Sequence, residues 1–207
     1  MSEEDYHRRI KAEKREAALK AAMELFAEQG YGRTSLQQIA QRAGLSTATL
    51  FKRFPTKGAL FEAIVEAFWR LEGPEAVLPP PGDPESGLRA LGADYAQRMR
   101  RPEMAALYRL IIAEIRHFPD LGQLQMDRNK VPYQSRMAEY LAAEARVGTL
   151  AIPDATRAAH QFMGLIAAEV LNPGLLRPDF AASDAEVESA VEEAVALLVT
   201  RYRPPPA

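Results

Sequence analysis

The sequence predicts an all-α protein of about nine helices, and three observations support this. Apolar residues recur throughout at the three- and four-residue spacing of a helix, and no stretch shows the sustained alternation of a strand. Helix-favouring Ala, Leu, Glu and Arg dominate the composition. The chain has 207 residues, 47% hydrophobic and 26% charged, as expected of a globular protein with a real core.

The N-terminal part predicts four helices with recognisable ends. Gly30 is a suitable stop for the first helix, and either Thr34 or Ser35 is a suitable cap for the second. The third ends before Pro55, and Thr56 then caps the fourth. The four predicted helices cover residues 15–29, 36–43, 47–53 and 56–71.

A dense group of prolines separates these helices from the rest of the chain. Five prolines fall between residues 73 and 87, and a helix cannot continue through them. This segment is therefore predicted to be a loop or semi-rigid linker. Helical patterns resume at residues 86–100, 102–117, 120–129, 132–147, 154–171 and 183–203.

Charge is unevenly distributed along the chain. Residues 1–60 hold 11 Lys and Arg against 7 Asp and Glu, a balance of +4, whereas the remainder carries −6 and the whole chain −2. This asymmetry favours an anionic partner for the N-terminal part. The absence of cysteine excludes disulfides and Cys-ligated metal sites. No signal peptide or membrane-spanning run is recognisable, so we expect a cytoplasmic protein with no membrane partner.

The second and third predicted helices have the spacing of a helix-turn-helix. Ala40 is small enough for two helices to cross closely, and Gly44 suits the turn because glycine adopts a left-handed backbone without penalty. Leu45 and Leu50 then fill the wedge between the helices. This arrangement directs the polar side chains of the third helix outward.

Such a helix can lie in the DNA major groove and offer its N-terminal side chains to base edges. Threonine hydroxyls can bind bases or phosphates, and Lys52, Arg53 and Lys57 can bind phosphates. The helix N-termini at Thr34 and Thr56 add backbone N–H donors for phosphate. An ordinary solvated basic face has a similar composition, so spacing alone leaves both interpretations open.

The run from Arg15 to Glu66 resembles the N-terminal domain of the TetR family of transcriptional regulators. The matching residues are Ala21, Ala22, Leu25, Phe26, Gly30, Tyr31, Thr34, Ser35, Leu36, Ile39, Ala40, Ala43, Gly44, Leu45, Ser46, Thr49, Leu50, Phe54, Pro55, Lys57, Leu60 and Phe61. The resemblance implies sequence-specific binding to double-stranded DNA. Predicted DNA-contacting residues are Thr34, Ser35, Ser46, Thr47, Ala48, Thr49, Phe51, Lys52, Arg53 and Lys57.

Three positions depart from the family pattern. Phe51 stands where a tyrosine commonly reaches a phosphate, so one positioning contact should be missing. Arg53 replaces a frequent His or Tyr and can bind phosphate instead. Ala48 replaces a usual glycine, which favours the helix.

The resemblance also implies a C-terminal all-α domain that binds a small ligand and forms a homodimer on a palindromic operator. Apolar stripes on the last two predicted helices fit a four-helix contact between two copies. The predicted interface residues are Phe162, Ile166, Val170, Val191, Val195, Leu198 and Tyr202. The alternative is that both stripes face the core of their own subunit.

Aromatic and methionine side chains of the middle helices suit an adaptable apolar pocket, although such residues also form plain cores. Residues 109–124 resemble multidrug-efflux-type repressors, which implies a lipophilic ligand. The predicted pocket residues are Tyr95, Met99, Leu107, Tyr108, Ile111, Ile115, Phe118, Met126, Tyr133 and Met137. Ligand binding is expected to move the fourth helix and so to change the separation of the two recognition helices.

The expected organisation is a tail and helix-turn-helix domain (1–56), a connecting helix (57–72), the Pro-rich loop (73–87) and a ligand-binding and dimerisation domain (88–207). An enzyme is not expected, because the three histidines stand singly and no catalytic, metal or cofactor motif occurs. The other alternative is a helical interaction module without operator or ligand. The sequence does not distinguish a repressor from an activator.

Overall fold

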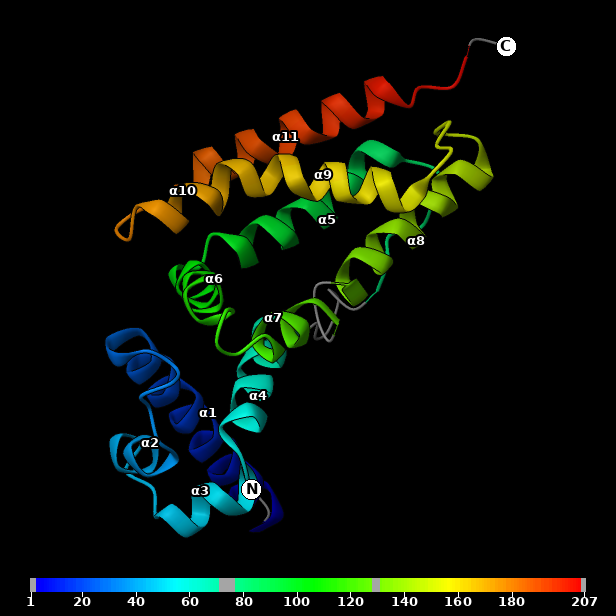
Figure 1. Ribbon diagram of the computed structural model, residues 1–207. Coiled ribbons are helices and arrows are strands. Elements are labelled where there is room, and N and C mark those ends of the chain that lie inside the picture. Colours follow the sequence, from blue (N-terminus) through cyan, green and yellow to red (C-terminus); the bar gives the residue numbers. More distant parts are fainter. Residues whose placement is uncertain (1–2, 71–76, 128–130, 206–207) are drawn as a thin grey trace. The chain divides into compact units, whose positions relative to one another are not determined.

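The protein is described here by a computed structural model that covers residues 3–70, 77–127 and 131–205. All regular elements in these ranges are helices, eleven in number, which confirms the predicted all-α class (Figure 1). Chain contacts divide the protein into two compact units. The N-terminal unit comprises the chain up to Phe68 together with Arg109–Met126, and the C-terminal unit comprises Trp69–Tyr108 and the chain from Asp127 onward.

The N-terminal unit contains the four helices that the sequence predicts. They are α1 (Glu3–Gln29), α2 (Leu36–Arg42), α3 (Thr47–Arg53) and α4 (Lys57–Trp69), the last of which passes into the C-terminal unit at Trp69. The end of α6 (Pro102–Glu114) and α7 (Asp120–Gln125) complete the unit.

Helix α1 begins at Glu3 rather than at residue 15, so the expected N-terminal tail is helical. Arg8 pairs with Asp5 at 3.2 Å and Arg9 with Glu13 at 3.4 Å, both at one-turn spacing. Such pairs support the first turns of α1, which are exposed to solvent.

Predicted stops and caps explain several of the helix ends in the N-terminal unit. Gly30 ends α1 with a positive φ of 84°. Ser35, rather than Thr34, caps α2 in a capping box with Gln38. The Thr56 hydroxyl accepts a hydrogen bond from the Ala59 N–H at 3.0 Å and caps α4 as predicted.

The C-terminal unit is a helical bundle. Its helices are α5 (Pro84–Met99), the first part of α6, α8 (Val131–Val147), α9 (Ala155–Val170), α10 (Asn172–Leu176) and α11 (Asp184–Arg201). Helices α5, α9 and α11 pack on one another and α8 packs on α9; α9 and α11 run side by side (Figure 1). The apolar stripes of α9 and α11 face this core.

The start of α5 and the segment after α9 differ from the sequence prediction. Part of the predicted Pro-rich loop, residues 73–76, lies outside the described residues, and its last four residues, 84–87, belong to α5. The Asp83 carboxylate caps that helix by accepting from the Ser86 N–H at 3.1 Å, and Pro84 is tolerated in the first turn because its missing N–H would be unpaired there. The short helix α10 was not predicted; it contains Pro173 in its first turn for the same reason.

A buried carboxylate ties the end of the Pro-rich segment to α8. Glu144 is completely buried, and its side chain accepts hydrogen bonds from the Tyr140 hydroxyl at 2.5 Å, the Gly82 N–H at 3.0 Å and the Thr149 hydroxyl. These donors replace the water that the carboxylate loses on burial. The Tyr140 hydroxyl is thereby fixed against α5.

Replacing Gly87 on α5 by Ala is expected to destabilise the protein. A Cβ there would lie 1.9 Å from the Tyr140 hydroxyl oxygen. We expect a loss of about 1–3 kcal/mol from overpacking, although Gly→Ala alone favours a helix by about 1 kcal/mol. Urea unfolding measures the difference, with Gly58→Ala as control because its nearest neighbour is 3.7 Å away. A gain in stability at both positions would contradict the packing described here.

Candidate DNA-binding site

Helices α2 and α3 form the predicted helix-turn-helix. Ala40 and Leu50 are almost completely buried between them. Gly44 has a positive φ of 66°, and the Leu45 N–H donates to the Ala40 carbonyl at 2.9 Å, which closes the turn. The turn therefore needs a residue without a Cβ penalty, as the sequence predicts.

One face of α3 is exposed and carries most of the predicted DNA-contacting residues. Leu50 faces the core, whereas the remaining α3 side chains are exposed: Thr47, Ala48, Thr49, Phe51, Lys52 and Arg53. Ser46 caps the helix by accepting from the Thr49 N–H at 3.1 Å, and the two hydroxyl oxygens are 2.7 Å apart. The exposed row combines hydroxyl, methyl and cationic groups, which suits a DNA groove.

Arg53 connects the end of α3 to the first turns of α1. Its guanidinium donates to the Lys11 carbonyl at 2.5 Å. Lys11 and Lys14 are exposed on those turns, so cations that the sequence prediction left out lie on a helix bound to α3. The one-turn spacing of the Asp5–Arg8 and Arg9–Glu13 pairs is the sequence pattern that could have predicted that α1 begins before residue 15.

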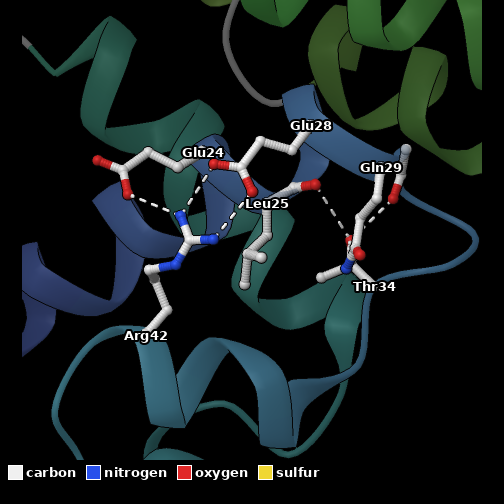
Figure 2. A network of polar contacts seen from close by, with 7 residues as sticks. Glu24, Leu25, Glu28, Gln29, Thr34 and Arg42 are labelled. Atoms are coloured by element: carbon white, nitrogen blue, oxygen red, sulfur yellow. Dashed lines mark hydrogen bonds and ion pairs between the residues drawn. The ribbon is translucent and has the colours of Figure 1, made fainter.

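Thr34 is placed differently from its prediction. Its side chain is only 3% exposed, and its hydroxyl donates to the Gly30 carbonyl at 2.8 Å and accepts from the Gln29 amide at 3.1 Å. Figure 2 shows this hydroxyl turned toward the C-terminal end of α1. Thr34 therefore holds α1 and the following turn together.

A second contact shown in Figure 2 fixes α2 to α1. The Arg42 guanidinium binds the Glu28 carboxylate through two bonds of 3.0 and 2.8 Å and reaches Glu24 at 3.4 Å. The hydrogen bond from Arg42 lowers the pKa of Glu28. The two-bond geometry resists rotation of α2, although exposure to solvent keeps its contribution to stability small.

Lys57, predicted to bind phosphate, is occupied by the turn that precedes α2. Its ammonium donates to the carbonyls of Tyr31 at 2.5 Å, Gly32 at 3.2 Å and Thr34 at 2.8 Å, and lies 4.4 Å from the centre of the Tyr31 ring. An ammonium has three donors, so these carbonyls can use all of them. Partial burial lowers the pKa of Lys57.

The same turn is held by residues from α6 and the segment after it, all within the N-terminal unit. The Glu114 carboxylate accepts from the Tyr31 N–H at 2.9 Å, and the Phe118 ring meets the Tyr31 ring edge-on at 5.0 Å. A Cβ at Gly30 would lie 2.7 Å from the Glu114 carboxylate, so this approach needs glycine. Phe118, predicted to line a ligand pocket, here packs on Tyr31 beside the DNA-binding helices.

The other predicted pocket residues are divided between the two units. Ile111, Ile115, Phe118 and Met126 belong to the N-terminal unit, where Ile115 and Met126 are exposed. The remainder belong to the C-terminal unit: Tyr95, Met99, Leu107, Tyr108, Tyr133 and Met137. All of these except the half-buried Tyr108 are buried.

Two of the C-terminal members, Tyr95 and Tyr133, belong to a group of aromatic rings and charges. The Tyr133 ring lies 5.4 Å from Trp69 and 5.7 Å from Tyr95, between ring centres. Its hydroxyl donates to Asp94 at 2.5 Å, and Asp94 pairs with Arg98 at 3.1 Å. Burial, followed by this bond to Asp94, raises the pKa of Tyr133.

The predicted dimer residues are buried within their own subunit. All seven are at most 7% exposed in the single chain: Phe162, Ile166, Val170, Val191, Val195, Leu198 and Tyr202. The stripe arises because core contacts within one bundle need the same spacing as contacts between bundles. Other apolar residues of α9 and α11 are exposed instead, among them Leu165 at 41% and Leu197 at 50%.

Neither a candidate metal site nor a membrane-spanning helix occurs within the described ranges. No group of three or more His, Cys, Asp or Glu residues there could hold a metal ion. No helix in the same part of the chain is long and apolar enough to cross a membrane.

Comparisons with known proteins match both parts of the chain. Residues 18–64 match the model of bacterial regulatory proteins of the tetR family, and residues 86–204 match the C-terminal domain of AefR-like transcriptional repressors. The uncharacterised HTH-type transcriptional regulator YezE of Bacillus subtilis is 32% identical over 112 residues, which are 51% of this chain and 57% of YezE. The match thus spans little more than half the length of that curated relative.

Solved structures match over nearly the whole chain. A Mesorhizobium loti protein assigned to the TetR family has a TM-score of 0.75 and 25% identity, covering 93% of this chain and 98% of its own. The flavonoid-responsive regulator FrrA has a TM-score of 0.71 and 28% identity, with the same coverage. The two family models together match most of the chain, and the helix-turn-helix has a buried core behind the exposed face of α3. This chain therefore belongs to the TetR family of DNA-binding transcriptional regulators.

Proposed function

We propose that the protein is a ligand-released repressor that acts in the cytoplasm as a homodimer on a palindromic operator. The exposed row on α3 carries this proposal, because Leu50 anchors the helix while the neighbouring hydroxyls and cations face outward. Thr47, Ala48 and Thr49 are the candidates for base contacts at the helix N-terminus, and Lys52 is the candidate for a phosphate contact.

The homodimer is proposed to form through the outer face of α9 and α11. A surface groove of about 520 Å³ there has a mainly apolar lining that includes Gly164, Leu165, Ala168 and Leu197. Small residues let two helices approach closely, and the exposed leucines supply area to bury. A two-fold axis at this face would give two α3 helices for the two halves of a palindrome.

The effector is proposed to be lipophilic and aromatic. The buried aromatic group of the C-terminal unit supports this, and so does the name of FrrA, which describes that protein as responsive to flavonoids. Ligand binding is proposed to stabilise a conformer in which α4 has moved, so that the two α3 helices no longer match adjacent major grooves. Coupling of roughly 1–3 kcal/mol is usual for such switches.

Selection of binding sites from a random duplex pool, repeated at rising salt, tests the proposal. We expect recovery of one palindrome whose affinity falls steeply with salt, as phosphate contacts require. Sedimentation of the protein with that duplex then gives the number of copies bound. Folded protein that recovers no sequence above background would favour the alternative of a helical interaction module with a vestigial helix-turn-helix.

Replacing Phe51 by Tyr is expected to strengthen operator binding. The Phe51 ring is exposed on the α3 face and cannot donate a hydrogen bond. A tyrosine hydroxyl there would add a phosphate contact, which we expect to raise affinity by about 0.5–1.5 kcal/mol. Fluorescence anisotropy of the labelled operator measures the change. Unchanged affinity would place position 51 away from the DNA backbone.

Replacing Lys57 by Met distinguishes a positioning residue from a phosphate contact. If Lys57 holds the turn before α2, its loss should cost about 1–2 kcal/mol of stability and weaken operator binding without changing the salt slope. Lys52→Ala is the matched control, because losing a direct phosphate contact should reduce the slope by about 0.9. A reduced slope with unchanged stability for Lys57→Met would restore the phosphate role.

A further inference from the structure

One hydrogen-bond donor in the C-terminal unit is buried and unused. The indole N–H of Trp69 has no partner among the described residues, and the side chain is only 5% exposed. An unpaired buried donor costs about 1–3 kcal/mol, so native proteins rarely retain one without a use. Trp69 is also the last residue of α4 and the first residue of the C-terminal unit.

The groups around this indole define what it could bind. The Tyr133 ring packs against the indole, and the Tyr95 ring packs against Tyr133. The indole therefore lies in a group of flat aromatic rings. The polar groups beside the rings are already paired with one another: the Tyr133 hydroxyl donates to Asp94, and Asp94 binds Arg98. Arg98 also donates to the Arg70 carbonyl at 2.8 Å. The indole N–H, by contrast, is a buried donor with no partner among the described residues, so it is free to receive a ligand atom.

From this arrangement we infer that Trp69 is the polar anchor of the effector site, and that the effector is a flat aromatic molecule with a neutral acceptor oxygen such as a ketone. This inference rests on the proposed function. An indole offers one donor and no acceptor, so it recognises a carbonyl oxygen and gains nothing from a hydrocarbon of the same shape. An anionic group is disfavoured, because the nearby guanidinium of Arg98 is already neutralised by Asp94.

Entry of such a molecule requires the rings to separate. Trp69, Tyr95 and Tyr133 are each at most 5% exposed, so these rings are closed to solvent in the structure. A ligand that binds between them must displace Trp69, and with it the C-terminal end of α4. Residues 57–68 of this helix belong to the DNA-binding unit, so the displacement of Trp69 is the event that links binding to operator release.

The test compares two neutral probes of similar outline, flavone and 2-phenylnaphthalene, together with a carboxylate-bearing flavone. Trp69 is the only tryptophan, so its fluorescence reports binding without a label. We expect flavone to change this emission and to release the operator, with an affinity at least about tenfold above that of either comparison probe. Equal affinities for flavone and the hydrocarbon, or no effect of flavone on Trp69, would overturn the inference.

Removing only the N–H separates the hydrogen bond from the ring packing. Expression in a tryptophan auxotroph supplied with 3-benzothienyl-alanine replaces this one indole by a ring of similar shape without a donor. Calorimetry should then show that flavone has lost its roughly tenfold preference over 2-phenylnaphthalene, whereas operator affinity without ligand is unchanged. A retained preference would overturn the inference.

The two proposals fail in different ways. Protein that binds no operator sequence, yet shows the Trp69-dependent preference for flavone, would support the site and overturn the proposed repressor. Protein that binds a palindrome, yet fails to distinguish the probes, would leave the DNA-binding role standing and overturn the anchor.

Discussion

Replacing Arg98 by Met is expected to destabilise the protein by about 3 kcal/mol or more. The Arg98 and Asp94 side chains are only 5% and 17% exposed, and the Arg98 guanidinium also binds the Arg70 carbonyl. Removing the cation leaves the Asp94 carboxylate charged in a poorly hydrated place, where the hydrogen bond from the Tyr133 hydroxyl does not neutralise it. Breaking one side of a buried pair typically costs about 3–5 kcal/mol. Urea unfolding followed by circular dichroism measures the loss.

The same helix provides a matched control. Arg89 on α5 also forms an ion pair, with Glu192 on α11, but both side chains are 46% exposed. Arg89→Met should therefore cost no more than about 1 kcal/mol. Equal losses for the two variants would mean that burial does not govern these pairs. Contacts other than the Asp94–Arg98 pair would then have to hold the aromatic group around Tyr133 in place.

Replacing Leu50 by Ala is expected to have the largest effect on DNA binding. Leu50 is 1% exposed and is the residue by which α3 is anchored to the core of the N-terminal unit. Truncating a buried leucine costs about 2–5 kcal/mol, partly because of the cavity that remains. An α3 helix that is free to shift cannot present its outer face in one register, so we expect operator affinity to fall at least about tenfold.

The adjacent residue separates the loss of the anchor from the loss of the DNA face. Phe51 follows Leu50 on the same helix and is 41% exposed, so Phe51→Ala should change stability by less than about 0.5 kcal/mol. Unfolding in urea and operator anisotropy would be recorded for both variants. If Leu50→Ala kept full operator affinity despite its lower stability, the helix-turn-helix core would not be what orients α3.

Local chemistry made the helix-turn-helix predictable from sequence. Gly44 with its positive φ, the cap at Thr56 and buried Leu50 each act within one turn or one helix crossing. Short-range rules of this kind need only neighbouring residues as input. The exposed face of α3 followed from the same periodicity.

Polar side chains with several possible partners were not predictable in this way. Lys57 lies close in sequence to the recognition helix, yet its ammonium binds the carbonyls of Tyr31 and Thr34. Thr34 bonds to α1 for the same reason: a buried polar group takes whichever partner replaces its water. Likewise, an apolar stripe on a helix does not show whether it faces its own bundle or another copy. For that reason Phe162 and Val195 were predicted at the dimer interface, although both are core residues.

The sequence by itself determined the helical class, the order and ends of most helices, and the amphipathic design of α2 and α3, because propensity, caps and periodicity are local. Only the tertiary structure decided that Glu114 and Phe118 hold the turn at Tyr31, and that the buried Trp69 indole has no hydrogen-bond partner among the described residues. Those facts depend on residues more than sixty positions apart meeting in one place. Packing alone settles which of them meet.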